Sequence, residues 1–417
     1  MPVTGPQKCA VLLCKFTNSV NNPANDPAFF WDMFTHRGGQ SMNDYFIDIS
    51  NNIINLDGTQ IFGWRTIPMT DAEYIAANPN RYNRIHGVLP YFFPQVDPSK
   101  FAMIITIFNG DVKDGGTWGG VLVNFDSING TFLGHEMGHN FGLNHSYDTS
   151  DRKDADWSGP GEYFDSYDIM SAMNVYGVPH ERYGSVGPRL CALYVDQQGW
   201  MPDAKKFHFN SGGGSSPVTI DIKSMSHAEQ PGYQMVYLDD NYTIEFRTKE
   251  GWDASIPDTT ILIHSKRNGL AYLEMSNPST FDHAWSEGAT WTNANPFMAV
   301  TGGIEYRVHV DKYFTDIFTA RVTILGIVHP RKRILDGLVG QIIGGVAVDG
   351  NGGIIVNGVY HPVPPRGPEY EILKNLSELA SLHEQDIKKE IANRIDKLEN
   401  IEKAAEKEIK QLRSQQK

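Results

Sequence analysis

The chain contains a run of histidines whose spacing fits a metal site. His135, His139 and His145 lie in the pattern H-E-x-x-H-x-x-G-x-x-H. Residues four apart on a helix share one face, so His135 and His139 can direct two imidazoles at one ion. Gly142 lies where this helix must end, because glycine accepts the left-handed turn that folds the chain back. His145 can then supply a third nitrogen, and three neutral imidazoles with one open position make a catalytic zinc site.

Glu136 is the candidate catalytic residue of this site. It follows His135 directly and can reach a water molecule on the ion. Zinc lowers the pKa of such a water toward ~7, so Glu136 can take its proton and pass it to a leaving amine. The alternative is an ordinary amphipathic helix with solvent-facing histidines, which does not require Gly142 and His145 at these positions.

The stretch resembles the zinc signature of the metzincin metalloproteases. That clan also has a methionine-containing turn beneath the zinc, and the sequence Y-D-I-M-S at 167–171 is similar to it, with Met170 as the methionine. Met173 lacks the same surroundings. In some metzincins a tyrosine two residues after the methionine touches zinc, and Ala172 at that place predicts that no such ligand follows the turn. The Gly-Trp-Met-Pro at 199–202 is similar to the domain end of gametolysin-like and immune-inhibitor-A-like members.

The segments that must position this site alternate between strand and helix patterns. Buried strands are expected at 8–17, 101–108 and 118–125, with helices after Pro27 and after the capping residues Ser41 and Thr70. The pattern predicts an α/β (α+β) domain with a mixed sheet, and the zinc helix follows it. It also matches the upper half of a metzincin catalytic domain.

The same resemblance implies a substrate-binding edge. Residues 119–124 would be the edge strand above the cleft, and an exposed edge can take up an extended peptide by strand addition. The alternative is an ordinary edge strand without a ligand. The candidate substrate-binding residues are Gly119, Gly120, Val121 and Leu122.

Composition divides the chain into four segments. Residues 1–204 are expected to form the zinc metalloprotease domain, and short alternating runs in 205–330 predict an accessory β-sandwich. Residues 331–368 are rich in glycine and proline and predict a hairpin and linker, and 369–417 predict an amphipathic helix or coiled-coil strand. The apolar stripe of this helix is expected to pack on another copy, on a partner or back on the body. The Gly/Ser run at 211–216 predicts that 1–204 keeps the zinc site without the later segments.

Overall charge and cysteine content limit the partners. The formal net charge of −13 argues against nucleic acid and anionic membranes as partners, and no apolar run is long enough to span a bilayer. The three cysteines do not make a disulfide framework and are expected to be buried thiols. The N-terminus lacks the features of a secretory signal, whereas the resemblance implies secretion, so localisation stays open.

Five acidic residues follow the histidines, and they allow a second metal hypothesis. Carboxylates can bind a structural Ca²⁺ ion, but their spacing matches no loop signature. A solvated acidic loop is the alternative. The residues are Asp148, Asp151, Asp154, Asp156 and Asp165.

These residues together predict a zinc-dependent endopeptidase that hydrolyses protein or peptide substrates. Glu136 would be the base and then the acid, and His135, His139 and His145 the zinc ligands. Two alternatives remain open: a peptide- or glycan-binding protein with a retained zinc scaffold, and a zinc hydrolase of a non-peptide amide. The sequence does not name the substrate or the cleavage site.

Overall fold

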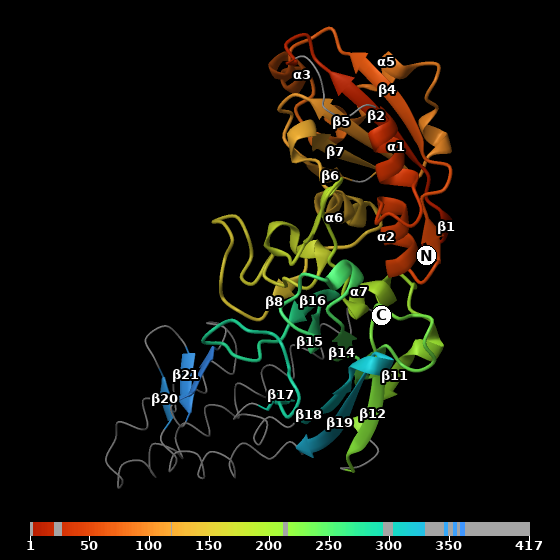
Figure 1. Cartoon of the computed structure of the whole chain (residues 1–417). Coiled ribbons are helices and arrows are strands. Elements are labelled where there is room, and N and C mark those ends of the chain that lie inside the picture. The colour runs from red at the N-terminus through yellow and green to blue at the C-terminus, as the bar shows by residue number, and fades with distance from the viewer. Residues whose placement is uncertain are drawn as a thin grey trace, which may run out of the picture. The chain divides into compact units, whose positions relative to one another are not determined.

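A computed structural model describes residues 3–20, 27–117, 119–211, 216–294 and 303–329, and the backbone of three short strands within 346–362. It divides into two compact units, Met1–Trp291 with Arg307–Leu325, and Thr292–Tyr306 with Gly326–Lys417. The architecture is mixed α/β with several sheets and few helices (Figure 1). The helix predicted at 369–417 lies outside the described residues, as do residues 212–215 of the predicted linker.

A five-stranded sheet forms the upper part of the first unit. Its strand order is β4-β2-β5-β7-β6, and all neighbours are parallel except β6, which runs antiparallel to β7. The strands are β2 Cys9–Lys15, β4 Gln60–Thr66, β5 Met103–Asn109, β6 Gly115–Thr117 and β7 Gly120–Asn124.

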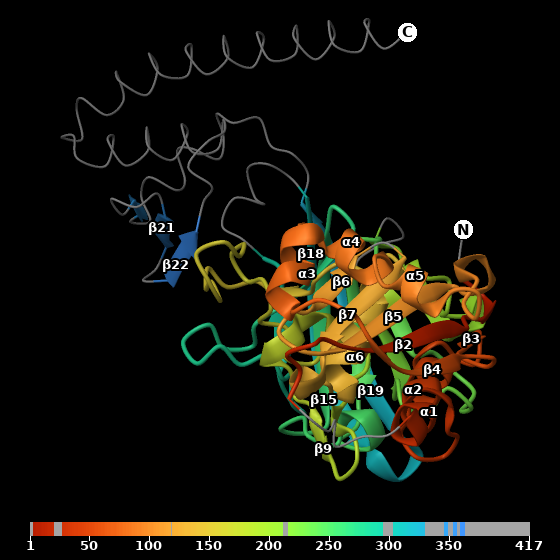
Figure 2. The same ribbon diagram turned by 90° about the horizontal axis from the view of Figure 1, so that it is seen from above.

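Helices cover both faces of this sheet (Figure 2). Successive residues of a strand point to opposite faces, so in β2 Val11 packs with the helices of one face and Leu12 with those of the other. One face carries α1 Pro27–Thr35, α2 Met42–Ile49 and α6 Gly130–Asn140, and the other carries α3 Asp71–Ala77, α4 Arg81–His86 and α5 Leu89–Phe92. Because both faces are buried, the central strands are almost continuously apolar.

Local sequence signals place the helix starts. Ser41 and Thr70 each accept a hydrogen bond from the backbone three residues on, and Asp44 and Glu73 complete the two predicted capping boxes. Cys9, Cys14 and Cys191 are free and buried, as predicted. A further helix, α7, covers Ala192–Gln197.

Residues after the five-stranded sheet form further sheets. A six-stranded sheet has the order β11-β13-β14-β15-β16-β8, and a four-stranded sheet has the order β12-β19-β18-β17. The strands of the first are β8 Tyr147–Asp148, β11 Lys206–Phe209, β13 Met235–Leu238, β14 Tyr242–Arg247, β15 Thr260–Arg267 and β16 Leu270–Leu273. Those of the second are β12 Val218–Lys223, β17 Thr290–Thr292, β18 Gly303–Phe314 and β19 Thr319–His329.

Three small sheets complete the described structure. β1 Gly5–Pro6 pairs with β3 Ile54–Asn55, and β9 Val178–His180 pairs with β10 Gly184–Val186. Where a hairpin was predicted, Val346–Val348 (β20), Gly353–Val356 (β21) and Val359–Pro362 (β22) form an antiparallel three-stranded sheet.

The first unit continues across residue 204, where the sequence suggested a domain boundary. Strand β8, directly after the histidine motif, pairs in parallel with β16 of the later segment. One hydrophobic core contains Met137 of α6 together with Met235, Trp252 and Ala271. The segments before and after residue 204 therefore bury apolar side chains against each other, and each would expose them without the other.

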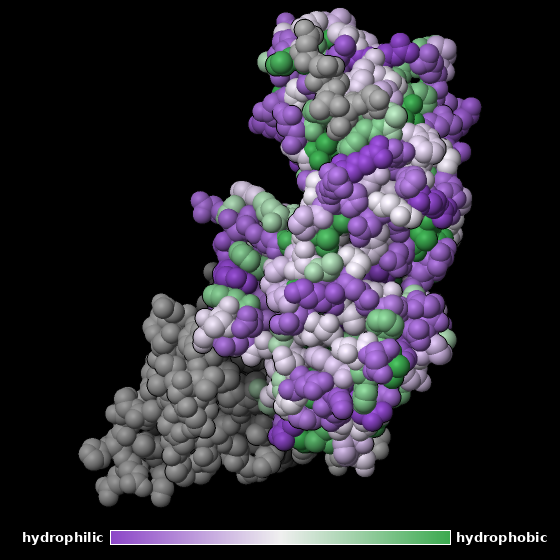
Figure 3. Space-filling view, viewed as in Figure 1, coloured by the Kyte–Doolittle hydropathy of each residue, from purple (hydrophilic) through white to green (hydrophobic). Residues whose placement is uncertain are grey.

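The visible surface is mostly polar. In the view of Figure 3, hydrophilic residues cover most of the described surface and apolar residues lie in small separate patches. Within the described residues no helix is both long and apolar enough to cross a membrane.

Candidate metal centre

Helix α6 presents the first two histidines. Asn129 caps its start by accepting a hydrogen bond from the amide of Phe132, a cap that the sequence pattern did not identify. His135 and His139 lie one turn apart, and the helix ends at Asn140. Gly142 then adopts φ +87, the left-handed conformation that its glycine predicted, and the chain turns back.

The turn brings His145 to the other two histidines. The candidate ligand atoms of all three side chains lie within 4.8 Å of one another. Within the described residues they form the one group of three or more His, Cys, Asp or Glu side chains that could hold a metal ion. The spacing in the sequence therefore predicted which side chains meet.

The other nitrogen of each ring is held by an oxygen. His135 Nδ1 lies 3.0 Å from the Ile169 carbonyl oxygen, and His139 Nδ1 lies 2.9 Å from that of Leu143. His145 Nδ1 lies 2.6 Å from Glu162 Oε1. A carbonyl or ionised carboxylate oxygen only accepts, so each ring carries a proton on Nδ1. When the ring is neutral, Nε2 then offers its lone pair.

These lone pairs fit a zinc ion. His135 Nε2 and His139 Nε2 lie 3.1 Å apart, with no proton between them in this arrangement. Two nitrogens at 2.0–2.1 Å from a tetrahedral zinc would be separated by roughly 3.3 Å. Burial, the main cause, lowers the pKa of His135 to about 3 and also lowers that of His139. Both rings are therefore neutral at neutral pH, the form that binds metal.

Glu136 lies buried beside this group. Its carboxylate accepts a hydrogen bond from the Gly116 amide, so the side chain extends from α6 to strand β6. Burial is the largest cause that raises the pKa of Glu136 to about 7, and the hydrogen bond from Gly116 opposes it. A carboxyl group with a pKa near neutrality suits general base and acid chemistry.

Met170 packs directly against helix α6. It belongs to a short 3₁₀ segment, Ile169–Asn174, and is fully buried, whereas Met173 is exposed. A Cβ atom on Gly138 would lie only 2.6 Å from the Met170 sulfur, so the glycine permits this close approach. The backbone of this segment also holds the His135 ring through Ile169.

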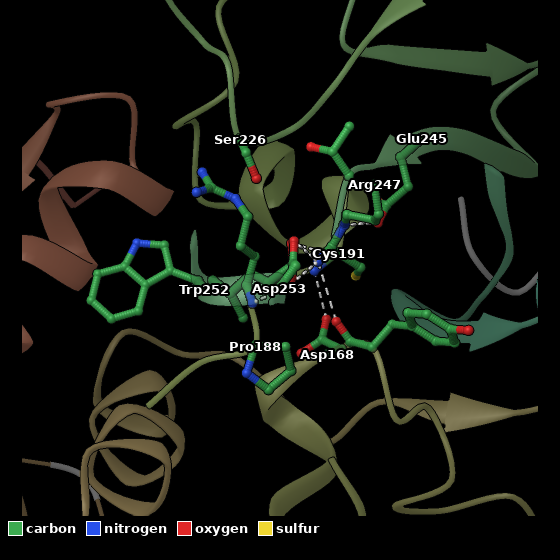
Figure 4. A network of polar contacts seen from close by, with 12 residues as sticks. Asp168, Pro188, Cys191, Ser226, Glu245, Arg247, Trp252 and Asp253 are labelled. Carbon is green, nitrogen blue, oxygen red and sulfur yellow. Dashed lines mark hydrogen bonds and ion pairs between the residues drawn. The ribbon is translucent and has the colours of Figure 1, made fainter. Parts of the chain in front are cut away.

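A buried polar network fixes the methionine segment (Figure 4). The Asp168 carboxylate accepts hydrogen bonds from the amides of Met170, at 2.7 Å, and Cys191, at 2.8 Å. Arg247 of β14 donates to the carbonyl of Leu190 and to both carboxylate oxygens of Asp253. The residues after 204 therefore stabilise the segment that contains Met170.

The edge strand was assigned incorrectly from the sequence. Gly119, Gly120, Val121 and Leu122 do not lie at a free edge, because β7 pairs with β5 on one side and with β6 on the other. Val121 and Leu122 are fully buried. The physical reason is that Gly115, Gly116 and Thr117 fold back and pair with β7, which makes β6 the edge.

The acidic residues after the histidines do not gather. Asp151, Asp154 and Asp156 are exposed, whereas Asp148 and Asp165 are buried. The buried pair already has protein donors: Asp148 accepts from Ser150, Arg152 and His283, and Asp165 from His264 and the Tyr167 amide.

Two side chains at the site were missed from the sequence. Glu162 holds His145, and the Tyr163 hydroxyl lies 3.2 Å from His145 Nε2. Burial, the main cause, raises the pKa of Tyr163 above the usual value of tyrosine. Neither residue stands at a spacing that belongs to the histidine motif, and only the fold of the loop after β8 brings them back.

A scan of protein families, a search of curated proteins and a search of solved structures each found no match. The chemistry of the site must therefore be argued from its own residues.

Proposed function

We propose that this protein is a zinc-dependent endopeptidase of the metzincin type with an accessory β-sandwich. The observation that carries the proposal is the convergence of three imidazoles on the same helix and turn as the buried carboxylate of Glu136. His135, His139 and His145 would hold the zinc ion. When bound, the ion would supply a Lewis acid that polarises the scissile carbonyl and lowers the pKa of a water molecule toward ~7.

Glu136 would perform the proton transfers. It takes a proton from the attacking water, whose oxygen forms the new bond to the carbonyl carbon. It then gives this proton to the amide nitrogen and the carbon–nitrogen bond breaks; the second proton of the water also passes to the amine, so a carboxylate and a protonated amine leave. Burial raises the pKa of Glu136 to about 7, which supports both steps.

The substrate would lie along β6. This strand is the edge of the five-stranded sheet, and its Gly116 amide contacts Glu136. The Gly116 amide and carbonyl are bonded to Glu136 and Arg81, so an extended peptide added to this edge would replace these contacts and pass next to the carboxylate. This arrangement favours a peptide bond within a chain as the bond that is cut.

Zinc content and cleavage of a mixed peptide library test the proposal together. We expect one zinc ion per chain and cleavage that Glu136→Ala abolishes. Bound zinc without any cleavage would contradict the peptidase proposal and favour a non-peptide amide as substrate. Absence of both zinc and cleavage would favour a binding protein with a retained scaffold.

A further inference from the structure

The phenol of Tyr163 is directed into the histidine cluster. Its ring centroid lies 4.4 Å from that of His145, and its hydroxyl lies 3.2 Å from His145 Nε2. The side chain is 6% exposed. Tyr163 thus places a buried hydroxyl at the atom that would bind the metal.

The direction of the hydrogen bond between Tyr163 and His145 follows from the partner of the other ring nitrogen of His145, Nδ1. Glu162 lies 2.6 Å from His145 Nδ1, so the ring proton is on Nδ1 and Nε2 is an acceptor. In the neutral ring, the form that binds metal, the Tyr163 hydroxyl is therefore the donor to Nε2. Glu162 also accepts from the Gly159 amide at 2.6 Å, which fixes the carboxylate and with it the ring.

A metal ion and the phenol compete for one lone pair. Once His145 Nε2 binds zinc, it can no longer accept from Tyr163. A buried hydroxyl without a partner is unfavourable, so the freed O–H needs another acceptor. The open side of the metal site is where the carbonyl oxygen of a bound peptide would lie.

We propose that Tyr163 is a further catalytic residue, whose hydroxyl donates a hydrogen bond to the scissile carbonyl oxygen as negative charge develops on it. This role rests on the proposed peptidase function. It needs a donor held in place before the reaction, because a preorganised donor stabilises the transition state more than the ground state.

The backbone holds Tyr163 in an uncommon conformation that serves this placement. Its φ is +68, in the left-handed region that non-glycine residues rarely adopt. Its amide donates to the Ser146 carbonyl at 3.2 Å, directly beside His145. Uncommon backbone conformations persist where the surroundings enforce them, and they cluster at functional sites.

The substitution Tyr163→Phe removes the hydroxyl and keeps the ring. Tyr176→Phe is the matched control, because the Tyr176 ring packs on Tyr167 and not on a histidine. With a peptide from the library as substrate, we expect kcat of Tyr163→Phe to fall roughly 10²-fold, the effect of losing one oxyanion donor. KM should change by less than about threefold, and Tyr176→Phe should match the parent.

Zinc binding distinguishes this role from that of a metal ligand. In the metal-free protein the phenol blocks Nε2, so Tyr163→Phe should bind zinc as tightly as the parent or a few-fold (~2–5) more tightly in a chelator competition. Addition of zinc to the parent should produce a tyrosine ultraviolet difference band that Tyr163→Phe lacks and Tyr176→Phe keeps.

Three results would overturn the proposal. One is a kcat for Tyr163→Phe within about threefold of the control. Another is weakened zinc affinity that accounts for the lost rate, and the third is the absence of the zinc-induced band in the parent. If the parent cleaves no peptide, the catalytic role falls with the peptidase function, and the band still tests separately where the hydroxyl lies.

Discussion

At the scale of single residues, the proposed site separates the side chains that would hold the metal from the one that would move protons. Glu136 contacts the Gly116 amide of β6 and does not belong to the cluster of three histidines. His145 is a member of that cluster, and Glu162 orients it. Substitutions should therefore fall into distinct classes when metal content and turnover are measured side by side.

Glu136→Ala should remove turnover and leave zinc bound. Loss of a general base lowers kcat by ~10²–10⁴-fold. His145→Ala should instead weaken zinc binding, with activity partly recovered by excess metal, because two imidazoles hold the ion poorly. Metal analysis beside peptide cleavage checks both. Parental turnover by Glu136→Ala would refute its role as the base, and full zinc with full rate in His145→Ala would move the third ligand elsewhere.

Glu162→Gln should weaken zinc binding without removing any ligand. The carboxylate holds the proton of His145 on Nδ1, and loss of such a partner typically lowers metal affinity or activity ~10–100-fold. Competition with a chromophoric chelator measures the change. Glu181→Gln is the control, since Glu181 is exposed. Equal affinities for the two variants would show that the ring keeps its orientation without Glu162.

At the scale of elements, glycine residues let helix α6 approach its neighbours closely. A Cβ on Gly134 would meet the Ile169 side chain at 2.6 Å, and one on Gly138 would meet the Met170 sulfur at the same distance. Each glycine directly precedes a candidate metal-binding histidine in the sequence, and each lets α6 pack closely on the segment that contains Met170. These two glycines therefore serve packing, which the metal-binding pattern alone does not explain.

Gly138→Ala should destabilise the protein although alanine is the better helix former. Helix propensity favours alanine by ~1 kcal/mol, whereas forcing a methyl group into a packed site costs ~1–3 kcal/mol. Chemical denaturation measures the free energy of unfolding. Combining Gly138→Ala with Met170→Val should destabilise less than the sum of the two single changes. Simple additivity would mean that Met170 is not what the new methyl group meets.

At the scale of the whole molecule, the first unit depends on a buried ion network between its early and late segments. Arg247 contacts Glu245 at 2.7 Å and Asp253 at 3.0 Å, with all three side chains fully buried. It also donates to the carbonyls of Leu190 and Tyr167. These contacts join β14 to Tyr167, which precedes Asp168, and to Leu190, which precedes the Cys191 amide that Asp168 binds.

Arg247→Met should lower the stability of the first unit severely. Removing one partner of a buried ion pair costs ~3–5 kcal/mol, because the carboxylates are left uncompensated. Arg321→Met is the matched control: Arg321 pairs with Asp221 at 2.7 Å, but both side chains are nearly half exposed. Its thermal midpoint should match the parent. A similar small shift for both variants would mean that the buried network contributes little.

Residues 1–204 alone should not keep the zinc site, contrary to the expectation from the Gly/Ser run. Removal of the later segment would expose the core residues that pack on Met235, Trp252 and Ala271, and it would remove the Arg247 network around Asp168. A fragment ending at 204 should show less cooperative unfolding and weaker zinc binding than the full chain, measured by circular dichroism and metal analysis. A fragment with parental zinc affinity would restore the modular interpretation.

The sequence by itself determined the features that depend on short-range geometry. The spacing of His135, His139 and Gly142 follows from the helical repeat and its left-handed end, and the caps at Ser41 and Thr70 follow from bonds within one turn. Burial of both sheet faces explains why the apolar runs predicted the central strands. These signals need no knowledge of distant parts of the chain.

Only the tertiary structure decided what depends on distant segments. Strand β6 pairs antiparallel with β7 and is therefore the edge strand. Strand pairing is selected by the whole sheet, and the glycines of β6 have no apolar pattern that would predict it. The loop after β8 brought Glu162 and Tyr163 to His145, and β8 itself joined the later sheet. Contacts of this kind are chosen by packing of the complete unit, so residue spacing within one motif does not encode them.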